Sequence, residues 1–188
     1  MLGPHIAAAE LTRLAASPDA ALRASVAAHP NTPPPVLAEL GAEFPAEVLG
    51  NPALPLLRLA QPGLLAGWPA RTLEALTTVP GAPDWLLRLA AAHEKIDVQL
   101  AAVTRTELPG DVLERLSRSP FWTIREYVAR KPQLPPGVLA HLARDLDYGV
   151  RLTVANRPGL PPDLRHLLRR DPHPLVQAVI LLAEGERG

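Results

Sequence analysis

The chain of 188 residues has no cysteine, so it forms no disulfide and offers no cysteine nucleophile. No apolar run approaches the ~20 residues that a membrane-spanning helix needs, and we expect no membrane segment. Residues 1–5 also lack the positively charged start of a signal peptide. Together these absences predict a cytoplasmic protein.

Motifs that carry chemistry are absent as well. The sequence has no glycine-rich phosphate loop, no His-Glu-x-x-His and no Gly-x-Ser-x-Gly. His166 and His173 lie near Asp171, but that aspartate is the expected cap of a helix, which leaves too few ligands for a metal. The sequence therefore predicts no enzyme, no catalytic residue, no metal site and no cofactor.

Proline is abundant and stands in register. Of the 23 prolines, twelve fall into two columns whose members mostly recur every 26 residues. The first column holds Pro4, Pro30, Pro52, Pro80, Pro132 and Pro158, with Thr106 at one step, and the second holds Pro33, Pro55, Pro83, Pro109, Pro135 and Pro161. Proline at this frequency without a period suggests a disordered chain, whereas proline that recurs at a fixed period marks the turns of a repeat.

The prolines separate two short helical segments in each repeat. In the first segment the apolar residues follow the spacing i, i+3, i+4, as at Val150, Thr153 and Val154, which lie on one helix face. Ser17, Ser119 and Asp171 each precede a proline near the start of this segment. Because a cap followed by proline opens a helix, these three residues are the predicted N-caps.

The second segment begins at the second-column proline and is about two turns long. Its apolar residues follow the spacing i, i+1, i+4, as at Val138, Leu139 and Leu142. A helix this short needs tertiary packing, so we expect Leu139 and Val154 to be buried between adjacent repeats. Neither segment alternates like a strand, which predicts an all-α protein.

The pattern Val-Arg-x-x-Val-Ala-x-x-Pro-x-Leu-Pro-x-x-Val-Leu-x-x-Leu-Ala resembles the leucine-rich repeat variant family. The resemblance is clearest over residues 98–170 and extends more weakly back to residue 4. It implies a right-handed α-solenoid of about six 26-residue repeats, each a helix plus a short second helix of α or 3-10 type. HEAT-like repeats share the helix pair but have longer units. Some family members carry a cysteine-rich iron–sulfur segment, which this chain cannot form.

The repeat is irregular over residues 41–72, within what we expect to be a single repeat domain of residues 1–188. The step from Pro30 to Pro52 is four residues shorter than the 26-residue period, and the following step, from Pro52 to Pro80, is two residues longer than it. The second of these steps is also rich in glycine and proline. A bend in the array explains this better than a dedicated binding loop, although both interpretations remain open.

Basic residues form two columns. Arg105, Lys131 and Arg157 make up one, and Arg125 and Arg151 the other. Such columns could bind phosphates or acidic side chains. The alternative is local pairing, as between Asp147 and Arg151 four residues later. Arg125 has Phe121 where Arg151 has Asp147, so we expect it to be unpaired and available for a partner.

Aromatic residues interrupt otherwise polar columns. Phe121 shares a column with Asp19, Lys95, Asp147 and His173, and Trp85 shares one with Pro35, Asp111, Gly137 and Asp163. Trp122 and Tyr148 stand in one further column and are expected to be neighbours. Exposed aromatic side chains are typical interface anchors. The alternative is that they cover the ends of adjacent helices.

These observations predict a non-catalytic scaffold that binds a protein or peptide. We expect an acidic peptide to contact Arg125, Trp122 and Tyr148. The runner-up partner is the phosphate backbone of a nucleic acid, because residues 101–170 hold 12 basic against seven acidic residues. The chain has no net charge, however, which argues against this. The apolar residues 175–183 predict a last helix covered by a second copy of the chain, in a homodimer, rather than by a short tail.

Overall fold

A computed structural model describes residues 2, 3 and 5–185. Within this part of the chain every regular element is a helix and no strand is present, so the predicted all-α class is confirmed. The chain divides into two compact units, residues 1–102 (unit 1) and residues 103–188 (unit 2). The single repeat domain stays a prediction, and Pro4 of the first proline column lies outside the described residues.

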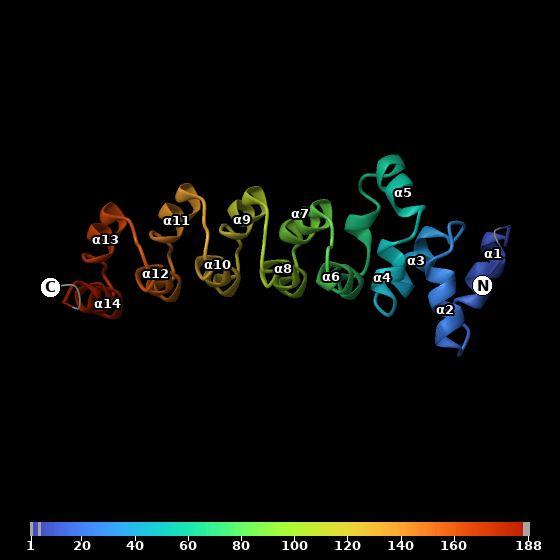
Figure 1. Cartoon of the computed structure of the whole chain (residues 1–188), viewed down its shortest axis with the longest axis horizontal. Helices are drawn as coiled ribbons and strands as arrows, with labels where there is room; N and C mark the ends of the chain where they lie inside the picture. The colour runs from blue at the N-terminus through green and yellow to red at the C-terminus, as the bar shows by residue number, and fades with distance from the viewer. Residues whose placement is uncertain (1, 4, 186–188) are drawn as a thin grey trace. The chain divides into compact units, whose positions relative to one another are not determined.

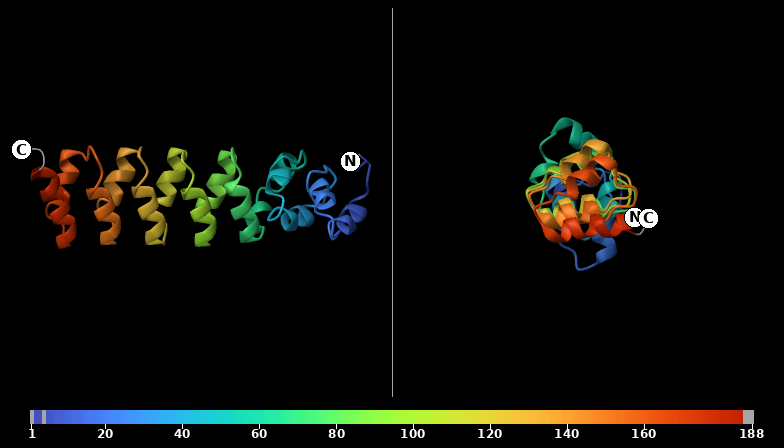
Figure 2. Two further views of the ribbon diagram at one scale, coloured as in Figure 1. Left: turned by 60° about the horizontal axis from the view of Figure 1, so that its bottom comes forward. Right: turned by 90° about the vertical axis from the view of Figure 1, so that its left-hand side faces the viewer.

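Unit 2 is built from two sets of helices (Figure 1). The first helices of its repeats are α10 (Trp122–Ala129), α12 (Tyr148–Ala155) and α14 (Pro174–Gly185). The second helices are α9 (Gly110–Leu116), α11 (Pro136–Leu142) and α13 (Pro162–Leu168). Helix α12 packs against both α10 and α14, and each second helix packs on the first helices beside it. Figure 2 shows the same pairing, from yellow to red, in a second view.

The second helices begin where the proline pattern predicts. Pro109, Pro135 and Pro161 are their N-caps, with ψ between 138° and 146°, and the helix starts at the next residue. Proline suits this position because its fixed φ precedes the turn and it has no N–H to leave unpaired. The second helices are α-helices, and the one 3-10 helix within the described residues is η1 (Leu65–Gly67) in unit 1.

The first helices start two residues later than the caps predicted from the sequence. Asp147 is the N-cap of α12 and accepts hydrogen bonds from Gly149 N (2.8 Å) and Val150 N (3.3 Å). Ser119 instead lies outside α10, where its Oγ accepts the N–H of Phe121 at 3.2 Å. Ser17 and Asp171 do the same for the N–H two residues on. The three predicted caps are therefore wrong by two residues, because these side chains brace the turn that precedes each helix.

The core of unit 2 follows a spacing of i, i+4, i+5. Val150, Val154 and Ala155 are buried, whereas Thr153 at i+3 is only partly buried. The burial of Val154 is confirmed. The prediction for Leu139 is wrong, since it stays partly exposed while other residues of its helix close the interface. The buried residues of α11 are Val138 and Leu142.

Unit 1 contains the remaining helices. These are α1 (Ala8–Leu14), α2 (Ala20–Ala27), α3 (Pro34–Leu40), α4 (Pro45–Leu49), α5 (Leu54–Ala60), α6 (Ala70–Thr78), α7 (Asp84–Ala92) and α8 (Ile96–Val103), the last of which reaches the boundary. Helix α2 packs against α1, α3 and α4, and α6 packs against α3, α4 and α7.

The irregular stretch of the sequence corresponds to a short α4 and to the 3-10 helix η1, an additional element that follows the second helix α5. Helix α4 has five residues where α10 has eight, so the missing turn is lost there. Helix α6 closes on α3 at Gly41, where a Cβ would lie 2.7 Å from Thr72 Cγ2. Only glycine fits this approach, and Thr72 donates from its Oγ1 to Ala38 O at 2.6 Å. The choice between a bend and a binding loop stays a prediction.

Candidate interaction surface

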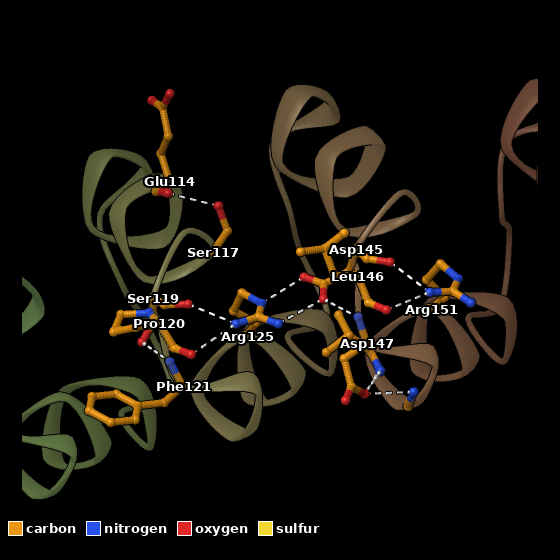
Figure 3. A network of polar contacts seen from close by, with 12 residues as sticks. Glu114, Ser117, Ser119, Pro120, Phe121, Arg125, Asp145, Leu146, Asp147 and Arg151 are labelled. Carbon is orange, nitrogen blue, oxygen red and sulfur yellow. Dashed lines mark hydrogen bonds and ion pairs between the residues drawn. The ribbon is translucent and has the colours of Figure 1, made fainter.

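Arg125 and Arg151 each join three parts of unit 2 (Figure 3). Arg125 donates from Nε to Asp145 Oδ2 (2.7 Å) and from Nη2 to Oδ1 (2.8 Å), while its Nη1 donates to Ser119 O at 2.8 Å. Arg151 repeats this geometry with Asp171 and the carbonyl of Asp145. Each arginine is therefore held by the acid of the next repeat and by the turn before its own helix.

Charge and burial reinforce these two ion pairs. The side chains of Asp145 and Asp171 are 3% and 4% exposed. Burial raises the pKa of each carboxyl, but the hydrogen bonds from arginine and from the N–H two residues on outweigh it, so each pKa lies below its ordinary 3.8. The carboxylates stay ionised at neutral pH and neutralise the two guanidinium groups.

The prediction that Arg125 is unpaired is wrong, and so is the expected pairing of Asp147 with Arg151. The carboxylate that pairs with Arg125 belongs to Asp145, which lies 20 residues farther along the chain and so cannot be predicted from helix spacing. The Asp147 carboxylate instead caps α12. Both arginines thus have structural partners inside unit 2, and their role in partner binding stays untested.

The other basic column binds backbone carbonyls of the preceding repeat. Arg157 Nη1 donates to Ala129 O and Lys131 O, both at 2.6 Å, and its Nη2 donates to Pro132 O at 3.0 Å. Lys131 Nζ donates to Arg105 O in the same way. Burial lowers the pKa of both Lys131 and Arg157, because partial loss of water disfavours the charged form. This column ties repeats together.

In unit 1, Asn51 and His29 of the same column also bind backbone carbonyls of the preceding repeat, without lysine or arginine. Asn51 Nδ2 donates to Ala27 O (2.7 Å) and His29 O (2.9 Å), and His29 Nε2 lies 3.0 Å from Gly3 O. Asparagine, histidine, lysine and arginine share an N–H donor and differ in charge. Where the position holds one of these residues, its N–H donor reaches the previous repeat and its charge is incidental to that contact, whereas Val79 at the same position in unit 1 has no side-chain donor.

Two of the aromatic residues, both at the first position of a helix, are exposed. Trp122 is 50% exposed at the first position of α10, and Tyr148 is 46% exposed at the first position of α12. One face of Tyr148 is covered by His173, whose ring stacks on it with centroids 3.9 Å apart and planes 7° apart. Because α10 and α12 pack side by side, these two aromatic residues mark the same end of neighbouring helices.

Phe121 and Trp85 are less accessible than expected. Both are only partly exposed. Phe121 is the N-cap residue of α10, and the guanidinium of Arg58 lies 4.8 Å from the centre of the Trp85 ring. The alternative reading, in which an aromatic side chain covers neighbouring structure, fits these two residues better than it fits Trp122 and Tyr148.

Leu146 is the surface residue that the sequence analysis missed. Its side chain is 99% exposed in the connection between α11 and α12. Pro120 occupies the corresponding place one repeat earlier, and both carbonyls accept a hydrogen bond from an arginine of the helix that follows (Figure 3). A leucine in a column of exposed prolines was the available signal.

Other kinds of site find no support among the described residues. There, no group of three or more His, Cys, Asp or Glu side chains is placed to hold a metal ion. In the same part of the chain, no helix combines the length and the apolar character required to cross a bilayer.

Comparison with known proteins identifies part of unit 2. A search of the curated proteins and a search of the solved structures both found no match. A family model for the leucine rich repeat variant matches residues 122–147 and, directly after them, 148–173. The two matches begin at α10 and α12, so each spans a first helix, a second helix and the connection to the next repeat. Residues 122–173 are thus two adjacent leucine rich repeat variant repeats, part of a helical repeat scaffold of the kind typical of protein interaction.

Proposed function

We propose that the chain is a non-catalytic scaffold that binds a protein or peptide through an exposed apolar edge of unit 2. This apolar edge consists of Trp122, Leu146 and Tyr148. The observation that carries the proposal is the complete exposure of Leu146 in the connection that leads to the exposed Tyr148 of α12, which packs against the helix that begins with the exposed Trp122. Single exposed leucines are common, but a group of three large apolar side chains at one end of a helix pair is typical of an interface.

The basic columns described above are engaged in contacts within unit 2, so the proposal does not depend on them. Lys131 and Arg157 donate to carbonyls, and Arg125 and Arg151 are paired with buried carboxylates. Their hydrogen bonds hold the connections in place, which makes the apolar edge a preorganised surface. Arg105 lies in the same column and accepts the Lys131 hydrogen bond with its carbonyl.

Nucleic acid remains the second candidate partner, favoured by the exposed arginines of unit 2. Binding to a phosphate backbone requires many unpaired cations on one face, because each neutralised phosphate adds to the affinity. Arg125, Arg151, Lys131 and Arg157 all have acceptors inside unit 2. The peptide is therefore the better-supported partner. Homodimerisation through α14 stays a prediction, motivated by the exposed Leu175, Leu181 and Leu182.

A peptide display selection against the full chain tests the proposal. We expect selected peptides to lose at least tenfold in affinity for a Trp122→Ser/Leu146→Ser variant. Leu56→Ser is the matched control, because Leu56 is also an exposed leucine but lies on α5 of unit 1. Selected peptides that bind the edge variant as tightly as the unchanged chain would contradict the proposal.

A further inference from the structure

A third arginine column, apart from the two already described, lies at the ends of the second helices of unit 2. Arg118, Arg144 and Arg170 each stand two residues beyond the last residue of α9, α11 and α13. Their N–H groups donate to the carbonyl three residues earlier at 3.1, 3.0 and 3.1 Å. All three side chains are exposed. The backbone thus presents three guanidinium groups in equivalent positions.

The three guanidinium groups differ in the number of ion pairs and hydrogen bonds that they form. Arg118 forms an ion pair with Glu114 at 2.9 Å. Arg144 donates from Nη1 to Ala140 O at 2.9 Å and has no carboxylate partner among the described residues. The side chain of Arg170 makes neither a hydrogen bond nor an ion pair within the described part of the chain. The cause lies four residues earlier in each helix, where Glu114 gives way to Ala140 and His166.

The neighbouring carboxylates do not compensate the two available arginines. Asp145 and Asp171 follow Arg144 and Arg170 directly, yet both are buried against Arg125 and Arg151. Asp147 is engaged as the cap of α12. Among the acids next to the column, only Glu114 is therefore bound to an arginine of that column.

The column runs beside the apolar edge. Arg144 begins the connection that carries Leu146 and ends at Tyr148. The following connection contains Arg170 and His173, and the stacking of His173 on Tyr148 joins the two connections. Positive charge and apolar surface thus occur together at the connection that contains Arg144 and Leu146.

We propose that Arg144 and Arg170 bind the carboxylates of an acidic peptide segment whose apolar residues lie on the edge formed by Trp122, Leu146 and Tyr148. This rests on the proposed function and adds the chemistry of the partner. Packed helices lie ~8–10 Å apart, and a polyproline II peptide has about three residues per turn and advances ~3.1 Å per residue, so its residues i and i+3 share one face. Acidic residues three positions apart therefore match consecutive arginines, and the residues between them face the leucine.

Two other roles are conceivable for this arginine column, and experiments can distinguish each of them from peptide binding. A cation near a helix C-terminus stabilises the helix, which would make these arginines purely structural. A nucleic acid would use the same guanidinium groups for phosphate, although two available arginines offer few contacts. The acidic peptide is favoured because charge and apolar contact occur together at the same connections.

The test measures binding of labelled synthetic probes to the full chain. The probes are a peptide with glutamate at every third position and leucine between, the same peptide with glutamine, and a single-stranded oligodeoxynucleotide. We expect the glutamate peptide to bind most tightly, to weaken with added salt, and to lose tenfold or more on Arg144→Ser/Arg170→Ser. Arg130→Ser is the control, since Arg130 is an exposed arginine already paired with Glu126 at 2.7 Å.

Each other outcome separates this inference from the proposed function. If both peptides bind equally and only Trp122→Ser/Leu146→Ser weakens them, the acidic partner is wrong and the apolar edge stands. If neither double variant changes binding of these peptides or of display-selected ones, the proposed function fails as well. Tighter binding of the oligodeoxynucleotide, lost in Arg144→Ser/Arg170→Ser, would replace the peptide by a phosphate backbone. A lowered unfolding midpoint with unchanged peptide binding would assign the arginines to helix stability.

Discussion

The two units use one repeat position in chemically different ways. In unit 1, Asn51 reaches the carbonyls of the preceding repeat from a fully buried position, and in unit 2 the longer Arg157 does so from a partly exposed one. The arginine–acid pairs differ in a similar way. Arg23 and Glu43 meet at the surface, whereas Arg125 and Asp145 meet in a largely buried position. The comparison shows that hydrogen-bond geometry is retained while charge and burial vary.

The largest expected difference between the units comes from removing one acid of each pair. Asp145→Ala leaves the Arg125 guanidinium without its carboxylate and should lower the free energy of unfolding by about 3 kcal/mol. Glu43→Ala should have a much smaller effect, because the Glu43 side chain is 49% exposed to water whereas that of Asp145 is 3% exposed. Urea denaturation of the two variants checks this. Equal losses would show that burial does not distinguish the pairs.

A smaller difference is expected from one leucine column. Leu37 on α3 is fully buried, while Leu139 on α11 is partly exposed. Leu37→Ala should therefore cost about 2–5 kcal/mol of unfolding free energy, and Leu139→Ala clearly less. Thermal and urea unfolding of both variants provide the measurement. A larger loss at Leu139 would contradict the packing described for unit 2.

The hydrogen bonds from side chains to backbone carbonyls of the preceding repeat should lose their stabilising effect when the donor is removed, and not when only its charge is removed. Asn51→Leu leaves Ala27 O and His29 O without this donor and should cost about 1–3 kcal/mol of unfolding free energy. Arg157→Gln removes the charge but keeps an N–H donor, so we expect a loss below about 1 kcal/mol. Arg157→Leu, which removes both, is the matched comparison. If Gln and Leu are equally destabilising, the charge itself matters.

The smallest difference between the units is expected in the pH dependence of stability. The pKa values of Asp145 and Asp171 are lowered, so the two carboxylates should affect the stability of unit 2 in acid and not at neutral pH. A carboxyl whose pKa is depressed by folding stabilises the folded state above its ordinary pKa, and this stability is lost as pH falls through the folded value. Amides of unit 2 should therefore lose protection from hydrogen exchange below about pH 4. In Asp145→Asn/Asp171→Asn this dependence should flatten, while peptides from unit 1 keep theirs. An unchanged acid profile in the variant would show that other groups control it.

Local patterns predicted the parts of this fold that local forces determine. The second-column prolines fixed where the second helices begin, because proline restricts its own φ and the residue before it. Val150 and Val154 were identified from helical spacing, and both are buried. Exposure was predicted for Phe121 and Trp85, which interrupt polar columns, yet both are only partly exposed, because neighbouring structure covers part of each ring.

Contacts between repeats were beyond such patterns. Arg125 finds its carboxylate on Asp145 in the next repeat, and helix spacing alone gives no indication of it. The role of Lys131 and Arg157 depends on a backbone carbonyl, which has no sequence signature. A column in which His29 and Asn51 accompany lysine and arginine could have suggested a shared need for a donor. Leu146 was overlooked because a single leucine among prolines is a weak signal.

The hydrogen bonds of Lys131 and Arg157 to carbonyls also bear on how such an array can grow. An acceptor on the main chain is supplied by every residue type, so the donor of one repeat does not depend on the side chains of the repeat before it. A copied or deleted block of one period would keep each donor opposite an acceptor, and no second substitution would be needed to restore the match. The contacts of Lys131 and Arg157 with carbonyls, unlike the pairs of Arg125 and Arg151 with acids of the next repeat, would therefore persist if unequal recombination changed the number of repeats.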